Sequence, residues 1–313
     1  RECTVAETSV RPDMVTALVG GFACHYDQVI LVGEASFIKL VLELGERQGI
    51  DWREILVHVI VGEEPLAENA RKYLEDILGI DTSRPETGMI GSSMGVAELG
   101  LNLFFELPQL VALRRRLHAD EASRHAVLGQ GATTVPMLFT YDLSRIHVEV
   151  LENNDLVIST LDPDRLLPLI RYRTGDKASI LAPEQLAMIL GGDVPAEMAN
   201  LPVLMVHGRG QCALAGEDEK PVFPEQVKEG LYYDLEMAQL ATGNFRLTSG
   251  LLRAQVRIQL SPGVAVSPEI SDRFAIAVSR YVPAPISVTC EKYEDFAGGM
   301  ALDYERKFDY LGG

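Results

Sequence analysis

The sequence predicts an α/β fold: a parallel sheet with crossover helices, a small antiparallel sheet or barrel, and a smaller α+β domain. In the first half, short buried apolar strands alternate with amphipathic helices, the order typical of strand–helix–strand crossovers. From about residue 135 short strands and turns follow one another, which indicates antiparallel pairing. We expect a large domain at 1–208 and a mobile C-terminal α+β domain at 209–313.

The composition excludes several classes of protein. The 313 residues are 47% hydrophobic, which is enough to build a core, but the longest apolar runs are too short to span a bilayer. The net charge of −17 disfavours a nucleic-acid surface. Four scattered cysteines without a C-x-x-C pair predict reduced thiols in a cytoplasmic protein rather than a zinc site. We expect no nucleic-acid or membrane partner and keep a homodimer open.

The first half contains three strands and two helices. Apolar runs predict buried strands at 28–33, 54–62 and 88–93. The first helix is expected over residues 35–49, where Gly49 ends it. The second is expected over Pro65–Leu78, with Pro65 at its first position and Glu63 and Glu64 near its positive end.

The later elements follow from alternation, turns and caps. Short strands are expected at 135–141, 145–152, 155–160, 166–173 and 201–208, and a helix at 183–190. In the C-terminal domain we expect helices at 223–241 and 267–282 and strands at 244–250, 251–261 and 286–292. Asn153–Asp155 predicts a hairpin turn, and Ser267 is the expected cap of the last helix. The basic run Arg114–Arg116 is expected on a solvated helix face.

Three stretches place polar residues where strands end. VIVGEEP (59–65) leads from a strand into a helix and leaves backbone N–H groups free. SSMGVAELG (92–100) carries one acidic residue, Glu98, after a glycine-containing turn. RLLPLIRYRTGD (165–176) ends an apolar run in Asp176. Singly, each stretch has a plain structural interpretation.

Together, in this order, they resemble the adenylate-forming (AMP-binding) enzymes, and within them the phenylacetate–CoA ligase-like branch. GEEP (62–65) resembles a GAEP-type segment, and MGVAE (94–98) resembles a YGLTE-type segment. STLDPDRLLPLIRYRTGD (159–176) is similar to the long LPLIRYRTGD motif, and GR (208–209) to the hinge. The resemblance covers nearly the whole chain, more loosely after residue 210.

This resemblance implies an ATP-dependent acid–thiol ligase. Such an enzyme activates a carboxylic acid as an acyl-adenylate, releases pyrophosphate and passes the acyl group to a thiol. The implied cofactors are ATP, Mg²⁺ and coenzyme A, and the implied substrate is a small aryl or fatty acid. Phe104 and Phe105 could line an acyl pocket, but we expect them to pack in the core. The alternatives are an acyl-protein synthetase, adenylation without a CoA step, or a catalytically silent nucleotide- or acyl-binding homologue.

The resemblance also assigns nucleotide-binding residues. The residues expected on the adenine side are Gly62, Glu63, Glu64, Pro65, Met94 and Gly95. Glu98 would help to hold Mg²⁺ on the phosphates through oxygen ligation. The Arg-Tyr-Arg-Thr-Gly-Asp turn would deliver Asp176 from a strand end to the two ribose hydroxyls. Arg209 would approach the ribose or phosphate.

Two basic residues have further expected roles. Lys307, near the end of the chain, is the expected catalytic lysine, which would stabilise charge in the transition state. Lys292 is the competing assignment. Arg173 is expected to pair with a neighbouring carboxylate rather than with substrate.

The sequence departs from the family pattern at three places. The Ser/Thr/Gly-rich phosphate loop expected upstream of 28–33 is missing, and the first residue is Arg1 rather than Met. We therefore expect that an N-terminal portion is lacking; the alternative is a protein that kept the fold and lost catalysis. Met94 stands where the family has an aromatic residue, and Gln211 replaces an acidic hinge residue.

Overall fold

A computed structural model of the chain describes residues 3–162, 164, 166–192, 194–297 and 310–311. The chain divides into two compact units. The first unit contains Arg1–Ile60, Asn69–Ile90 and Ala213–Gly313, and the second contains Val61–Glu68 and Gly91–Cys212. The domain boundary that we expect between residues 208 and 209 stays a prediction.

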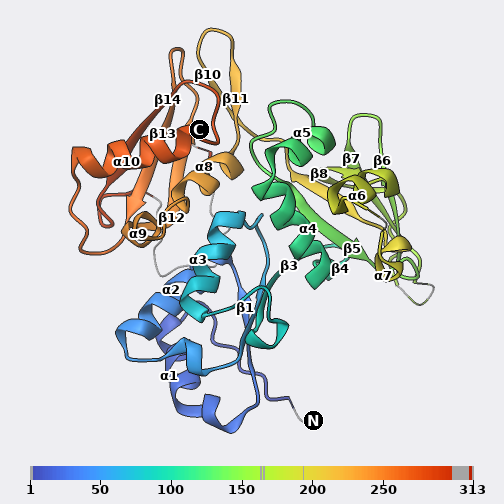
Figure 1. Cartoon of the computed structure of the whole chain (residues 1–313), viewed down its shortest axis with the longest axis horizontal. Helices are drawn as coiled ribbons and strands as arrows, with labels where there is room; N and C mark the ends of the chain where they lie inside the picture. Colours follow the sequence, from blue (N-terminus) through green and yellow to red (C-terminus); the bar gives the residue numbers. More distant parts are fainter. Residues whose placement is uncertain (1–2, 163, 165, 193, 298–309, 312–313) are drawn as a thin grey trace. The chain divides into compact units, whose positions relative to one another are not determined.

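The first unit is an α+β assembly. Its elements from the N-terminal part are α1 (Pro12–Phe22), β1 (Val29–Gly33), α2 (Ala35–Arg47) and most of β2 (Val57–Val61) and α3 (Glu68–Leu78). Its C-terminal elements are β10 (Ala213–Ala215), β11 (Lys220–Val222), α8 (Pro224–Leu231), α9 (Leu235–Leu240), β12 (Ala241–Thr248), β13 (Ala254–Leu260), α10 (Pro268–Ser279) and β14 (Ile286–Glu291). Strands β12, β13 and β14 form a sheet in that order, and α8 and α10 cover one of its faces (Figure 1).

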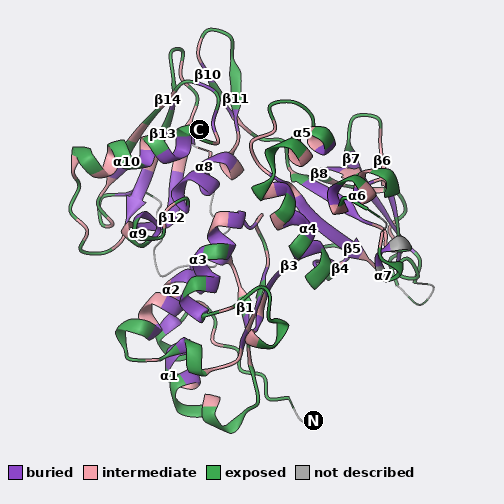
Figure 2. Cartoon of the chain, in the orientation of Figure 1, coloured by how far each residue is buried: buried purple, intermediate pink, exposed green. Residues whose placement is uncertain are grey.

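The second unit is built around antiparallel strands. Its elements are most of β3 (Met89–Val96), then β4 (Gly100–Phe105), α4 (Pro108–Ala119), α5 (Glu121–Leu128), β5 (Met137–Tyr141), β6 (Ile146–Val150), β7 (Asp155–Thr160), β8 (Tyr172–Ile180), α6 (Pro183–Leu190), α7 (Ala196–Ala199) and β9 (Leu204–Gly208). Helices α4, α5 and α6 pack against β5 and β9 around buried leucines such as Leu113, Leu138 and Leu186. Strands β5, β7 and β9 are largely buried, whereas β8 is mostly intermediate or exposed (Figure 2).

Hydrogen bonds order nine strands as β1-β2-β3-β4-β5-β9-β8-β7-β6. Along the chain, α2 and α3 alternate with β1, β2 and β3, as the first half of the sequence predicts. From β3 to β6 in this order, neighbouring strands are antiparallel. The antiparallel strands predicted after residue 135 are therefore part of the same strand series.

The C-terminal helices show how local side chains set helix boundaries. Ser267 caps α10 as predicted, because its Oγ accepts from the amide of Ile270 at 3.3 Å. The single helix predicted over 223–241 is wrong. Helix α8 ends at Leu231, and α9 begins at Leu235, directly after Asp234. Asp234 Oδ1 accepts from the amides of Glu236 and Met237 at 2.9 and 3.2 Å, which starts a new helix.

The start of α3 is also a correction. The helix begins at Glu68, three residues after the predicted Pro65. Glu63 has a φ of 70°, and the Glu64 amide donates to the Gly62 carbonyl at 2.9 Å. This is a γ-turn, which a helix cannot accommodate and which is strained for a non-glycine residue. Glu63 and Glu64 therefore belong to a turn before the helix.

The apolar stretch 166–173 does not form the predicted strand. Strand β8 begins only at Tyr172, and Leu166, Leu167 and Ile170 are exposed in the preceding loop. The backbone of Leu169 is held to Thr160 at the end of β7, where the Thr160 amide donates to the Leu169 carbonyl at 2.9 Å. The apolar residues that predict a strand therefore lie in the loop before β8.

Arg114 corrects the prediction of a solvated basic face. Its side chain is buried on α4 and pairs with Glu68. Its Nε donates to the Pro136 carbonyl at 2.9 Å, and Nη2 donates to the Val135 carbonyl at 3.1 Å. A buried guanidinium needs such partners, so Arg114 fixes the segment that leads into α3. Of the two phenylalanines predicted to pack in the core, Phe104 is buried against Tyr141, and Phe105 is only partly buried.

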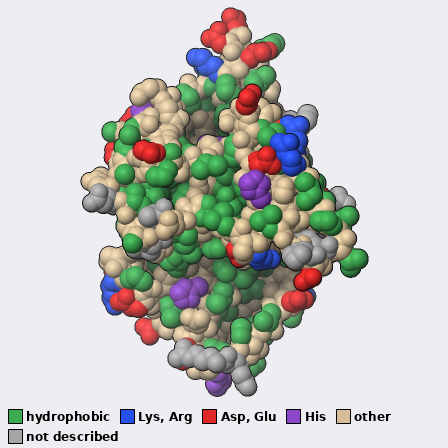
Figure 3. All heavy atoms as spheres, turned by 90° about the vertical axis from the view of Figure 1, so that its right-hand side faces the viewer, with side chains coloured by type: hydrophobic (Ala, Val, Ile, Leu, Met, Phe, Trp, Pro, Cys, Tyr) green, Lys and Arg blue, Asp and Glu red, His purple; other side chains and the backbone are tan. Residues whose placement is uncertain are grey.

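The surface carries large apolar areas. Figure 3 shows hydrophobic side chains (green) gathered over one face, and on the described part of that face Lys and Arg (blue) lie in scattered places. Among the helices that the structure describes, none combines the length and the apolar character needed to cross a bilayer.

Candidate functional site

Asp176 lies in a bulge in the middle of strand β8. Asp155 of β7 pairs with Lys177, and Val157 pairs with Arg173. One residue of β7, Leu156, therefore faces three residues of β8, namely Thr174, Gly175 and Asp176. Gly175 has a φ of 85°, a conformation that glycine adopts without a steric penalty. The predicted Thr-Gly-Asp turn at a strand end is wrong, because β8 continues on both sides.

The bulge brings Asp176 to Arg209, and these two predicted site residues meet. Arg209 follows β9 directly, and Gly208 at the end of β9 pairs with Lys177. Arg209 Nε lies 3.7 Å from Asp176 Oδ1, and the Asp176 side chain is only 15% exposed. A carboxylate has two oxygens, so Asp176 can accept hydrogen bonds from further donors beside Arg209.

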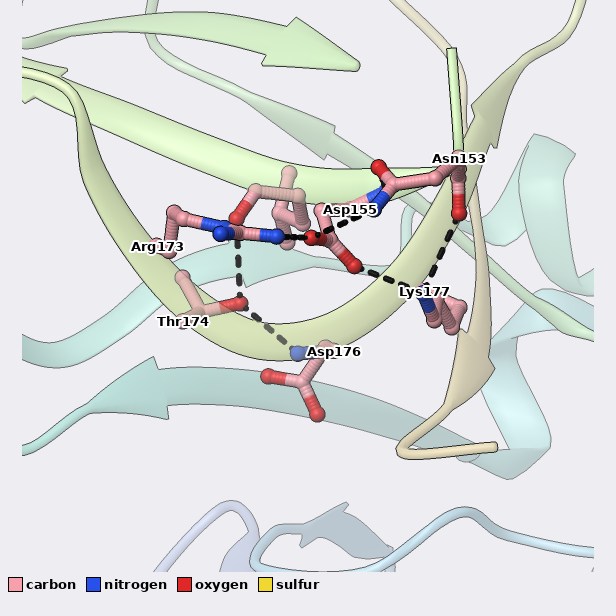
Figure 4. Close-up of polar contacts among 7 residues, drawn as sticks. Asn153, Asp155, Arg173, Thr174, Asp176 and Lys177 are labelled. Carbon is pink, nitrogen blue, oxygen red and sulfur yellow. Dashed lines mark hydrogen bonds and ion pairs between the residues drawn. The ribbon is translucent and has the colours of Figure 1, made fainter. Parts of the chain in front are cut away.

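Arg173 pairs with a neighbouring carboxylate, as predicted. Its Nη2 binds Asp155 Oδ2, and Lys177 Nζ binds Asp155 Oδ1 at 2.7 Å. Figure 4 shows the Asp155 carboxylate between these two cations, while the Asp176 carboxylate points away from them. The carboxylates of Asp155 on β7 and Asp176 on β8 therefore point in different directions.

The segment expected at the phosphates is the hairpin between β3 and β4. Met94 and Gly95 lie in β3, and Glu98 is exposed in the tight turn that follows. Gly95 is closely packed: a Cβ there would lie 2.8 Å from the Gly100 carbonyl oxygen. Only glycine fits this hairpin without a shift of the backbone.

Tyr172 connects this hairpin to β8. A hydrogen bond to the Glu98 carboxylate raises the pKa of the Tyr172 hydroxyl above its usual range. Tyr172 pairs with Ile158 just before the bulge that contains Asp176. Glu98 and Asp176 are thus both tied to β8, Glu98 through Tyr172 and Asp176 directly.

The GEEP segment lies beside β3. A Cβ on Gly62 would lie 3.8 Å from the Ser93 carbonyl oxygen, one residue before Met94. Glu63 is exposed, and Glu64 and Pro65 are partly buried. The structure brings this segment and Met94 to neighbouring positions, so the residues expected on the adenine side form one local group.

Two lysines are the remaining candidates for the site. Lys307 lies outside the described residues. Lys292 is exposed just after β14, where its carbonyl accepts from the Asp295 amide at 3.2 Å. The catalytic role of either lysine stays a prediction.

A magnesium ion fits Glu98 by its chemistry. Within the part of the chain that the structure describes, no group of three or more His, Cys, Asp or Glu side chains is arranged to hold a metal. Mg²⁺ is commonly bound by one or two carboxylates together with substrate phosphates rather than by an all-protein cage. The exposed carboxylate of Glu98 suits that arrangement.

Comparison with known proteins defines the fold. No family model and no curated protein matches the sequence. The chain is similar to solved structures of 2-hydroxyisobutyryl-CoA ligase in the postadenylation state with R3-HIB-AMP (TM-score 0.64, 11% identity, 98% of this chain and 58% of that one). It is also similar to the anthranilate CoA ligase AuaEII with anthranoyl-AMP (TM-score 0.53, 14% identity, 93% and 51%).

A third similar structure comes from work on fatty acyl-adenylate ligases from E. coli and L. pneumophila (TM-score 0.51, 13% identity, 91% of this chain and 52% of that one). The chain spans between half and three fifths of the length of these three structures. The similarity confirms the predicted fold, which is the α/β fold of adenylate-forming enzymes.

Sequence reasoning missed Asp155 and Tyr172. Asp155 closes a predicted hairpin turn, and its role depends on Arg173 and Lys177, which are distant in sequence. Tyr172 lies inside the longest motif, but its partner Glu98 is more than seventy positions away. Neither pairing has a local sequence signal, although the charge of Arg173 did predict that some carboxylate would face it.

Proposed function

We propose that this chain takes part in the ATP-dependent activation of a carboxylic acid as an acyl-adenylate. The observation that carries the proposal is that Asp176, with Arg209 beside it, and Glu98, through its hydrogen bond with Tyr172, both belong to or contact strand β8. This strand lies in a fold that the chain shares with ligases solved with an acyl-AMP bound.

In the proposed reaction, a carboxylate oxygen of the acid attacks the α-phosphorus of ATP. The bond from that phosphorus to the bridging oxygen breaks, and pyrophosphate leaves. Two anions must approach one another, so positioning and charge neutralisation provide most of the acceleration. Mg²⁺ would supply charge neutralisation at the phosphates when it is bound.

The residues of this chain have distinct proposed roles. Asp176 accepts hydrogen bonds from the ribose hydroxyls, and Glu98 ligates Mg²⁺ while Tyr172 orients its carboxylate. Gly62, Met94 and their neighbours contact the adenine, where the polarizable Met94 sulfur packs on the ring. Arg209, now beside Asp176, would contact the ribose or phosphate. Lys307 is the proposed catalytic lysine.

The proposed acyl acceptor is coenzyme A. Its thiolate would attack the acyl carbonyl, and AMP would leave. Two similar structures are CoA ligases, which supports this acceptor. Similarity to fatty acyl-adenylate ligases supports the second candidate, adenylation without a CoA step. Four free thiols fit the reduced cytoplasm where such ligation would occur.

The decisive test is exchange of labelled pyrophosphate into ATP, measured on the full-length natural protein with a panel of aryl and fatty acids. The proposal predicts exchange that depends on at least one acid and on Mg²⁺. The absence of exchange with every acid, in protein that is folded, would contradict adenylation. Thioester formation with the active acid, with and without coenzyme A, then separates the two candidates.

A further inference from the structure

We propose that Asp155 is a positioning residue that holds the β8 bulge in the shape that presents Asp176 to the ribose of ATP. The inference rests on the proposed function, because it takes Asp176 to be the ribose-binding carboxylate. Asp155 itself contacts no substrate in this arrangement.

The first support is that Asp155 binds both ends of the bulge. Arg173 and Lys177 are the two β8 residues whose register positions enclose the extra residues. Each places a cation on a different oxygen of the same carboxylate, with Lys177 Nζ 2.7 Å from Oδ1. Charge-assisted bonds of this kind are short and directional, so one carboxylate fixes the separation of the two ends.

The second support is that Asp155 is itself held in place. The Asn153 side-chain amide donates to Asp155 Oδ2 at 3.0 Å, and the Asp155 amide donates to Asn153 Oδ1 at 3.2 Å. Lys177 Nζ also donates to the Asn153 carbonyl at 3.1 Å. The carboxylate is only 12% exposed. Asn153 in the β6–β7 turn therefore holds Asp155 in place independently of the two cations.

The third support is the connection from the ends of the bulge to Asp176. The Asp176 amide donates to Thr174 Oγ1 at 3.1 Å, and Thr174 Oγ1 donates to the Leu156 carbonyl at 3.4 Å. Gly175 between them has the flexibility to adopt other conformations. Fixing Arg173 and Lys177 therefore limits the positions that the Asp176 backbone can take (Figure 4).

Asp155 also keeps two cations engaged away from Asp176. Arg173 is 61% exposed and Lys177 is 38% exposed, so both side chains have room to turn in solvent. Lys177 is adjacent to Asp176, which already has Arg209 beside it. Without Asp155, these cations are free to approach the Asp176 carboxylate and compete with the ribose hydroxyls for its lone pairs.

The test compares ATP with 2′,3′-dideoxy-ATP, which lacks both ribose hydroxyls, in equilibrium binding to the full chain with Mg²⁺. In the wild type, the Kd of the dideoxy nucleotide is expected to be at least about tenfold higher, since hydrogen bonds to a carboxylate are strong. We call the Kd of the dideoxy nucleotide divided by the Kd of ATP the Kd ratio. In Asp155→Asn, the Kd ratio is expected to fall below about threefold, while the Kd of the dideoxy nucleotide changes little. A general loss of structure would raise both Kd values together.

Two further variants complete the design. Lys177→Met releases one end of the bulge and should give an intermediate ratio, so the inference stays testable if Asp155→Asn folds poorly. Asp155→Glu keeps the negative charge and should restore most of the ratio. Glu149→Gln is the matched control: it removes the ion pair between Glu149 of β6 and Arg171 just before β8, whose atoms lie 3.2 Å apart, and should keep the wild-type ratio.

The outcomes separate the inference from the proposed function. A Kd ratio near one in the wild type would show that Asp176 does not bind the ribose hydroxyls, and the positioning role of Asp155 would fail as well. A high ratio in the wild type that persists in Asp155→Asn and Lys177→Met would overturn the positioning role alone.

Discussion

Two carboxylates, Glu43 in the first unit and Asp155 in the second, each bind a lysine and at least one further donor, yet their surroundings differ. Glu43 Oε1 binds Lys39 Nζ and accepts from the Tyr73 hydroxyl, both at 2.5 Å. The Lys39 side chain is 2% exposed. The cations on Asp155 reach into solvent instead. Both carboxylates are largely enclosed, but only the Glu43 cluster encloses its cation too.

The difference indicates which cluster serves the stability of the fold and which serves a site. A buried lysine without its carboxylate is costly, and burial already lowers the pKa of Lys39 despite Glu43. The cations at Asp155 can return to water at little cost. The Glu43 cluster should therefore determine whether the first unit folds, whereas the Asp155 cluster should determine how β8 presents Asp176.

The largest expected effect comes from Glu43→Ala. The change leaves the Lys39 cation buried without its carboxylate and removes the acceptor of the Tyr73 hydroxyl. We expect the free energy of unfolding to fall by about 3–5 kcal/mol, as measured by urea denaturation. The double variant Lys39→Met, Glu43→Leu should recover most of the lost stability, because it removes both charges of this cluster. A single variant as stable as the wild type would show that the two clusters do not differ in this way.

Asp176→Asn should affect the binding of ATP strongly and the stability of the fold little, the reverse of what the Glu43 cluster predicts. The Arg209 side chain beside Asp176 is 61% exposed and can return to water, so the free energy of unfolding should change by less than about 1 kcal/mol. The Kd for ATP should rise about 10- to 100-fold, because hydrogen bonds to a charged acceptor are replaced by weaker ones. Titration calorimetry measures the affinity, and urea denaturation measures the stability. Unchanged affinity would remove Asp176 from the site.

Gly175→Ala tests the bulge itself. The residue has a φ of 85°, and its Cβ would meet no other atom within 4 Å, so the only penalty is conformational. We expect a loss of about 1–2 kcal/mol in the free energy of unfolding and a weaker binding of ATP. Gly192→Ala is the matched control, because that glycine also has open space but lies outside the left-handed region. Equal stabilities of the two variants would argue against a strained bulge.

The smallest expected effect compares two tyrosines. Burial, followed by Glu43, raises the pKa of Tyr73, whereas the hydrogen bond to Glu98 is the main cause of the raised pKa of Tyr172. Glu98→Gln should therefore return the pKa of Tyr172 toward its usual range and leave Tyr73 unchanged. NMR titration of labelled tyrosine, assigned with Tyr172→Phe, would measure the pKa of Tyr172, and the Tyr73 signal should not titrate in either protein. An unchanged pKa of Tyr172 would show that Glu98 does not hydrogen-bond to Tyr172 of β8.

The sequence predicted those parts of the fold that local signals specify. Ser267 and Pro268 mark the start of α10, and the Asn153–Asp155 turn joins β6 and β7 as expected. The loop before β8 was missed because Leu166, Leu167 and Ile170 are apolar, although they remain exposed. The start of α3 was missed because the γ-turn at Glu63 has no sequence signature.

The residue types of the candidate site could be proposed from the sequence, but the side chains that support them could not. The long motif predicts Asp176 as a site residue, and the structure places Arg209 beside it. Arg114 looked like part of a solvated basic run, but its partner Glu68 lies far away in sequence and both side chains are buried. Such pairings depend on tertiary contacts, which a single sequence does not contain.

The most direct measurement is a crystal structure of the full-length protein with a non-hydrolysable acyl-adenylate analogue. The account predicts that an Asp176 carboxylate oxygen lies about 2.6–3.2 Å from a ribose hydroxyl, with the phosphate toward the β3–β4 turn. An analogue bound elsewhere, with Asp176 still facing Arg209 alone, would contradict it.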